Sequence, residues 1–144
     1  MYHKILVATD GSEHAQRAVL RAGELALCAP AEVMVITILH LPASYLLALG
    51  SGIGMGSEPW AALRRSCEQV LEEALTLLSS LGIQAKTELK MGEPGEEVLR
   101  LAREGGFDLI VAGRRGRGRT RSHLLGSVSS RISFGSPCDI LIVR

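Results

Sequence analysis

Apolar side chains recur along this chain with two different periods, and each period predicts a different kind of element. Continuous apolar runs predict strands buried on both faces at residues 4–9, 32–39, 107–112 and 138–143. Residues 83–91 alternate apolar with charged or polar side chains, which predicts an edge strand with one wetter face. Apolar residues spaced three or four apart predict helices between Ser12 and Pro30, between Glu58 and Gly82, between Gly95 and Gly105, and over 126–134.

Strands and helices alternate in this prediction, and such alternation is typical of a parallel sheet. We expect an open five-stranded parallel α/β sheet with helices on both faces, built as one domain over residues 1–144. A flavodoxin-like, Rossmann-like strand order of 3-2-1-4-5 would place the first and fourth strands side by side. Residues 40–57 contain Pro42 and alternating glycines at 50, 52, 54 and 56, so we expect an irregular, flexible loop there.

Composition narrows the picture without assigning a function. Hydrophobic residues make up 47% and aromatic residues 3% of the chain, so leucine, isoleucine, valine and alanine must fill the core. The three cysteines lie far apart without a CxxC pair and the four histidines show no ligand spacing, which argues against a zinc site or a disulfide framework. No apolar run is long enough for a membrane span or a signal peptide, so we expect a cytoplasmic protein that does not enter a membrane.

The strongest local signal is a glycine-rich, basic segment that follows the fourth predicted strand. It consists of Gly113-Arg-Arg-Gly116, then nine residues, then Gly126-Ser127. Glycines let the backbone approach a ligand closely, and a helix that begins at Gly126 offers unpaired N–H groups to an anion. Residues 113–131 contain six arginines and no acid, although the formal net charge of the chain is only +1. The segment therefore predicts a localised phosphate site.

A second segment, residues 8–12, follows the first predicted strand and contains Asp10. Ligands of open α/β sheets bind beyond the carboxyl ends of the strands, where the strand order reverses. The first and fourth strands are neighbours in the expected order, so Asp10 and the glycine-rich segment should face one site. Residues 8–12 lack a Gly-Lys-Ser/Thr ending, so this turn is not a Walker-type phosphate loop.

Together these motifs resemble the nucleotide-binding universal stress proteins, and the resemblance covers essentially the whole chain. Residues 4–12 are similar to the first strand and turn of that family, and residues 136–143 fit its ending. Every defined position of its ATP-binding pattern, G-x2-G-x9-G-[ST], is matched by Gly113, Gly116, Gly126 and Ser127. The resemblance implies a regulatory stress-response protein with little or no turnover. It would bind ATP, or else AMP or ADP, with Mg²⁺ bound through the phosphates.

The resemblance also implies roles for individual residues. Asp10 would accept hydrogen bonds from the ribose hydroxyls, and Ile38 would offer backbone groups to adenine. The nucleoside would be flanked by Ala8, Thr9, Ala112 and Gly113. The phosphates would be held by the glycine-rich segment and the start of the following helix, through Gly116, Gly126, Ser127, Val128 and Ser129. Arg115 would also bind the nucleotide. The family further implies a homodimer in which the last strand, Ile140 to Val143, pairs with its copy.

Other interpretations stay open beside this one. Asp10 also suits an Asx turn or a helix cap. His40, just after the second strand, suits either a ligand contact or a cap on the sheet edge. Arg117, Arg119 and Arg121 suit either a solvated loop face or the binding of a phosphate or another anion. The alternative function is a slow ATP hydrolase or nucleotide-transfer enzyme. Nucleic-acid binding is not expected, because the basic cluster lacks interleaved aromatics, and a protein partner is left unspecified.

Overall fold

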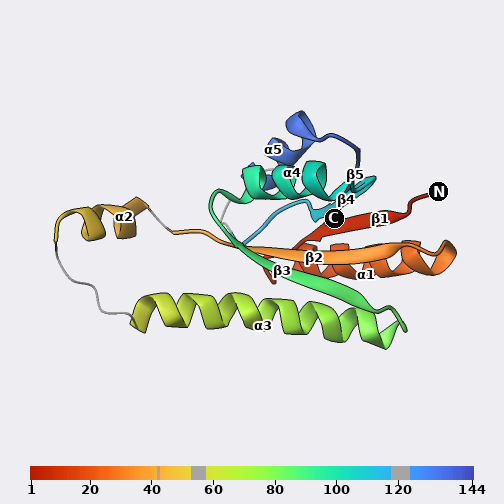
Figure 1. Cartoon of the computed structure of the whole chain (residues 1–144), viewed down its shortest axis with the longest axis horizontal. Coiled ribbons are helices and arrows are strands. Elements are labelled where there is room, and N and C mark those ends of the chain that lie inside the picture. The colour runs from red at the N-terminus through yellow and green to blue at the C-terminus, as the bar shows by residue number, and fades with distance from the viewer. Residues whose placement is uncertain (42, 53–57, 118–123) are drawn as a thin grey trace.

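The chain forms one parallel sheet whose strands are joined by helices (Figure 1). The computed structural model describes residues 1–41, 43–52, 58–117 and 124–144. In chain order the elements are β1 Lys4–Ala8, α1 Glu13–Cys28, β2 Glu32–Leu39, α2 Ala43–Gly50, α3 Glu58–Ser80, β3 Ala85–Met91, α4 Pro94–Gly105, β4 Leu109–Gly113, α5 Ser127–Gly135 and β5 Asp139–Val143.

The strand order is β3-β2-β1-β4-β5, and every neighbouring pair is parallel. The order and the parallel sheet confirm the expected fold class. Ile5 of β1 lies opposite Val33 of β2 on one side and Leu109 of β4 on the other. Because β1 and β4 are neighbours, the segments that follow them leave the sheet at the same edge. β3 is an edge strand, as its alternating sequence predicts, but its half-buried and exposed residues do not alternate along the strand.

Successive residues of the inner strands point to opposite faces of the sheet, and each face has its own apolar core. Ile5 and Val7 are fully buried on the face covered by α1 and α3. Leu6 and Ile110 are fully buried on the face covered by α4 and α5. Figure 1 shows α3 on one side of the sheet and α4 with α5 on the other. Burial on both faces explains why these strands are continuous apolar runs.

Local sequence signals determine where two of the helices begin. Ser12 caps α1, and its Oγ accepts a hydrogen bond from the backbone N–H of Ala15 at 3.4 Å. Glu93 caps α4 by accepting from the N–H of Glu96 at 2.7 Å, and Pro94 occupies the first helical turn. Both helices therefore start directly beyond the carboxyl end of a strand, with their first-turn N–H groups partly satisfied by a side chain.

The expectation of an irregular segment at residues 40–57 is wrong for Ala43–Gly50, which form α2. Residues 45–49 have the sequence Tyr-Leu-Leu-Ala-Leu. Leucine and alanine are strong helix formers, so this run continues a helix until Gly50. The alternating glycines begin only where α2 ends, and Gly54 and Gly56 lie outside the described residues. No helix in the described ranges is both long and apolar enough to cross a bilayer.

Candidate functional site

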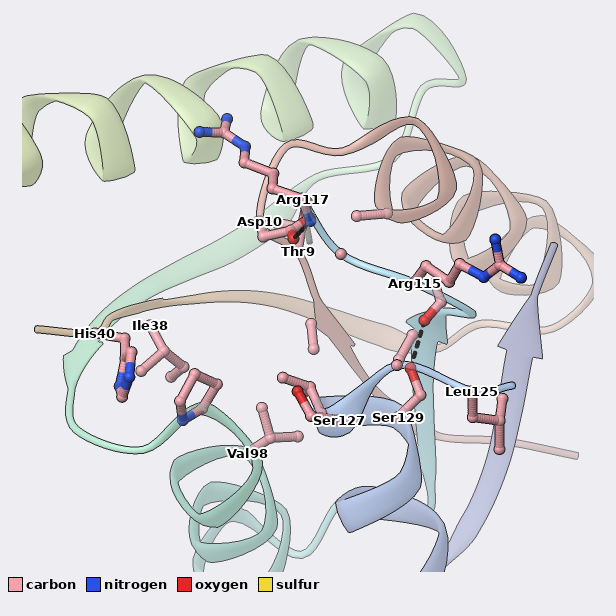
Figure 2. Close-up of a pocket in the computed structure, with 18 of the residues that line it drawn as sticks. Thr9, Asp10, Ile38, His40, Val98, Arg115, Arg117, Leu125, Ser127 and Ser129 are labelled. Carbon is pink, nitrogen blue, oxygen red and sulfur yellow. Dashed lines mark hydrogen bonds between the residues drawn. The ribbon is translucent and has the colours of Figure 1, made fainter. Parts of the chain in front are cut away.

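A cavity of about 700 Å³ opens at the carboxyl ends of β1, β2 and β4 (Figure 2). All twelve residues singled out from the sequence line it: Ala8, Thr9, Asp10, Ile38, Ala112, Gly113, Arg115, Gly116, Gly126, Ser127, Val128 and Ser129. They come from β1, β2, β4, α5 and the loops between them. The adjacency of β1 and β4 is what brings these distant segments together.

Asp10 lies where the two loops meet, and its carboxylate ties them to each other. Its Oδ1 accepts a hydrogen bond from the backbone N–H of Ser12 at 2.9 Å. Its Oδ2 accepts from the backbone N–H of Arg117, also at 2.9 Å. The first contact is the Asx turn that the sequence allows, and the second links the end of β1 to the loop after β4. Each carboxylate oxygen keeps a further lone pair for a ligand.

Glycine at position 116 permits this contact. A Cβ atom built on Gly116 would lie 2.4 Å from Oδ2 of Asp10, closer than any side chain can approach. Gly113, the last residue of β4, has the same relation to α1, because a Cβ there would lie 2.6 Å from the backbone carbon of His14. The two glycines of the G-x2-G part therefore allow close packing of this protein's own backbone, besides any approach to a ligand.

The start of α5 is open toward the cavity. Gly126 occupies the N-cap position, and no side chain caps this helix end. The N–H groups of Ser127, Val128 and Ser129 belong to the first turn, where a helix has no carbonyl partners of its own. The helix dipole adds partial positive charge at the same place. This end contrasts with α1 and α4, whose first turns receive a side-chain cap.

Ser129 lines the cavity, but its hydroxyl is bonded to the protein's own backbone. The residue is 3% exposed, and its Oγ donates a hydrogen bond to the backbone carbonyl of Gly113 at 2.6 Å. This bond is drawn in Figure 2. It fixes the start of α5 against the end of β4. Since the hydroxyl proton is engaged, the backbone N–H is the free donor that Ser129 offers at this helix end.

The two described arginines that line the cavity, Arg115 and Arg117, extend in different directions. In Figure 2 the side chain of Arg117 extends toward α3, and that of Arg115 extends toward β5. Burial raises the pKa of the Cys67 thiol on α3, and the nearby charge of Arg117 opposes that rise. Both arginines line the cavity, yet neither guanidinium points to its centre. Arg119 and Arg121 lie outside the described residues.

The far end of the cavity is apolar and includes residues that the sequence did not single out. Val98 of α4 lies there near Ile38 (Figure 2), and Pro94 of α4 also lines the cavity. Thr9 donates its N–H to the carbonyl of Ile36 at 3.0 Å, and strand alternation directs the backbone groups of Ile38 to the same side, past the end of β1. The sequence predicts that a helix starts just after the edge strand, but only the fold shows that the start of α4 faces the cavity.

His40 follows β2 at the same apolar end. Its Nδ1 lies 3.1 Å from the carbonyl oxygen of Gly92, the residue that follows β3. The side chain therefore caps the edge pair of strands and also lines the cavity. The cap foreseen from the sequence is present, and the ligand contact stays a prediction.

A profile of the universal stress protein family matches residues 1–144. The chain belongs to the universal stress protein family. Universal stress protein YxiE of Bacillus subtilis is 36% identical over 151 aligned residues, which span the full length of both chains.

Solved structures of universal stress proteins share this fold. Universal stress protein UspA from Lactobacillus plantarum superposes with a TM-score of 0.86 at 25% identity, covering 99% of this chain and 98% of its own. A universal stress protein determined in complex with cAMP superposes with a TM-score of 0.75 at 26% identity, covering 99% of this chain and 96% of its own. In the described ranges, no three His, Cys, Asp or Glu side chains group as a metal site.

Proposed function

We propose that this universal stress protein is a cytoplasmic, adenine-nucleotide-binding regulatory protein with little or no turnover. The observation that carries the proposal is the uncapped start of α5, which faces the Asp10 carboxylate across one cavity. A helix start suits a phosphate, and a carboxylate suits the two hydroxyls of a ribose. The similar structure in complex with cAMP supports an adenine nucleotide as the ligand.

The cavity divides into three parts that match the parts of a nucleotide. The first-turn N–H groups of Ser127 and Val128 would bind phosphate oxygens. Asp10 would accept the ribose hydroxyls with the lone pairs that Ser12 and Arg117 leave free. The backbone of Ile38, between the apolar side chains of β2 and α4, would bind adenine. ATP is the proposed ligand, with AMP and ADP using the same parts, and Mg²⁺ would be held through the phosphates.

Low turnover follows from the groups available to activate water. Asp10 is the one carboxylate among the described residues that line the cavity. Both of its oxygens already accept backbone N–H groups, so the carboxylate is engaged in holding the two loops together. The alternative of a slow ATP hydrolase is tested by phosphate release. Release by the wild type that is lost in Asp10→Asn would replace the regulatory proposal with that alternative.

Isothermal titration with ATP, ADP, AMP and cAMP, with and without Mg²⁺, tests binding directly. The sharpest variant is Ser127→Pro, because proline removes one first-turn N–H at the position where a helix tolerates it best. Gly126 has φ −64° and ψ 161°, a conformation favoured before proline. We expect Ser127→Pro to weaken ATP binding about tenfold or more, the effect of one lost hydrogen bond to a charged group.

Ser127→Ala is the matched control, because it removes the hydroxyl and keeps the N–H. It should bind ATP more tightly than Ser127→Pro does. Absence of binding by every adenine nucleotide, with the wild type folded, would overturn the proposed function. Equal affinities of the two Ser127 variants would overturn the role of the α5 start.

We also propose a homodimer through β5, in line with the family resemblance. β5 ends the sheet, and its residues 140–143 are apolar and only half-buried. Arg114 donates its N–H to the carbonyl of Val143 at 2.7 Å, so the backbone groups of Leu141 and Val143 face β4. Those of Ile140 and Ile142 face the open edge, where a second copy can pair with them.

Two proline variants separate the dimer from the fold. Ile142→Pro removes an N–H that faces outward, so it should give a folded monomer by light scattering. Leu141→Pro removes a bond within the sheet and should destabilise the protein itself. A wild type that is monomeric at all concentrations would overturn the dimer.

A further inference from the structure

The ring of His40 is held in one protonation pattern by the residue that follows β3. Its Nδ1 lies 3.1 Å from the carbonyl oxygen of Gly92. A carbonyl only accepts hydrogen bonds, so the hydrogen must be on Nδ1. In the neutral ring the other nitrogen, Nε2, then carries a lone pair and is an acceptor. The tautomer of His40 is thus determined by the fold.

The contact is anchored on both sides. Gly92 donates its own N–H to the carbonyl of Leu39 at 3.1 Å, so the residues flanking the ring are tied together. Leu39 is also paired with Met91 in the register of β2 and β3. Gly92 has φ +149°, which a residue with a side chain rarely adopts. The acceptor nitrogen therefore belongs to a ring whose position is fixed by the ends of two strands.

Around His40 the cavity wall is apolar. Ile38 and Val98 lie at this end, and Figure 2 shows the imidazole beside Ile38. His40 is itself exposed, so a bound base would cover its ring. Once covered, the ring nitrogen influences which base edge is accepted, because a polar atom then left without a partner costs free energy.

We propose that His40 selects the base of the nucleotide by accepting a hydrogen bond at Nε2 from the 6-amino group of adenine. Adenine presents an N–H donor at this position, whereas a 6-oxo purine such as guanine or hypoxanthine presents an acceptor. Two lone pairs would then face each other, so 6-oxo purines bind less well. This inference rests on the proposed nucleotide function and adds a specificity-determining residue to it.

The test compares AMP with IMP, which has a 6-oxo group, and with purine riboside 5′-monophosphate, which has no group at that position. Binding is measured by calorimetric titration at pH 8. His40→Asn is the key variant, because its side-chain amide can still donate to Gly92 and lacks the second ring nitrogen. His3→Asn is the matched control, since His3 lies against Asp108, outside the cavity.

We expect the wild type to bind AMP more tightly than either other nucleotide. His40→Asn should lose about three- to tenfold in AMP affinity, the effect of one neutral hydrogen bond, with IMP affinity unchanged. His3→Asn should match the wild type. Nitrogen-15 NMR gives a second readout: Nδ1 of His40 should be protonated, and the Nε2 resonance should shift on addition of AMP and not of IMP.

The outcomes separate this inference from the function on which it rests. An unchanged ratio of AMP to IMP affinity in His40→Asn, with AMP still bound, overturns base selection and leaves nucleotide binding intact. An equal loss of AMP and IMP affinity also overturns it, because His40 would then only shape the site. Absence of binding by all three nucleotides to the wild type overturns both proposals.

Discussion

At each end of the β1–β4 pair, an aspartate accepts backbone N–H groups and so links the two strands. At the amino end, Asp108 accepts from the N–H of His3 at 2.8 Å and from that of Lys4 at 2.9 Å. At the carboxyl end, Asp10 accepts from Ser12 and Arg117, both at 2.9 Å. Each carboxylate therefore connects chain next to β1 with chain next to β4.

What surrounds each carboxylate makes the two ends different. Beside Asp108 the ammonium group of Lys4 donates to the carbonyl of Gly105 at 3.0 Å and lies 5.9 Å from the centre of the Phe107 ring. Long side chains thus fill the amino end. At the carboxyl end Gly116 contacts Asp10, and the cavity opens beside it. An aspartate next to a strand is consequently no sign of a ligand by itself, and the glycines nearby decide whether space remains.

The largest effect is expected from Gly113→Ala, which tests whether close backbone packing holds the carboxyl end. The new Cβ would lie 2.6 Å from the backbone carbon of His14 and 2.7 Å from the nitrogen of Ala15, and helix backbone cannot move aside cheaply. We expect a loss of about 3 kcal/mol in the free energy of unfolding, measured with urea. This makes Gly113 unsuitable as a probe of ligand binding alone.

Gly126→Ala is the control for that prediction. Its Cβ would meet its nearest neighbour, the carbonyl oxygen of Arg114, at 3.3 Å, so a loss below about 1 kcal/mol is expected. If Gly113→Ala proved as stable as Gly126→Ala, α1 would have to shift freely against β4. The carboxyl end would then be held by Asp10 rather than by the packing of glycine.

A smaller effect is expected from removing either aspartate, and here the two ends should separate. Asp108→Ala should lower the free energy of unfolding by about 1–2 kcal/mol, because two backbone N–H groups lose a charged acceptor in a partly exposed place. The affinity of Asp108→Ala for AMP should equal that of the wild type. Asp10→Ala should cost a similar or smaller free energy of unfolding and also remove AMP binding. Calorimetric titration of Asp108→Ala that showed weakened AMP binding would mean that the ends are coupled.

Much of the fold was predictable because burial leaves a direct record in the sequence. Strands buried on both faces must be apolar throughout, and the edge strand β3 alternates, so the order of elements follows from periodicity. Bringing Asp10 and Gly116 together required only that β1 and β4 be neighbours. α2 was missed because the glycines after residue 49 outweighed the helix-forming run before them.

Details of the site depend on contacts between residues far apart in the chain, which no local pattern records. Asp10 receives an N–H from Arg117, 107 positions away, and His40 is fixed by Gly92, 52 positions away. The number of arginines is plain in the sequence, but the direction of Arg117 toward α3 depends on the loop backbone that Asp10 holds. The sequence therefore shows how many charges this loop carries, but it does not show where the side chains point.

The smallest effect concerns pH and sharpens the comparison at Asp108. Desolvation raises the pKa of this carboxyl, but the hydrogen bonds from His3 and Lys4 outweigh it, so the pKa lies below its ordinary value. A lowered pKa in the folded state stabilises the protein above the unfolded pKa of about 4, and the stabilisation is lost as pH falls through the lower, folded value. The difference in unfolding free energy between the wild type and Asp108→Asn should therefore be larger at pH 6 than at pH 2.5. Urea unfolding of both proteins at the two pH values measures it, and a difference that did not shrink in acid would mean that the charge of Asp108 contributes nothing at this end of the sheet.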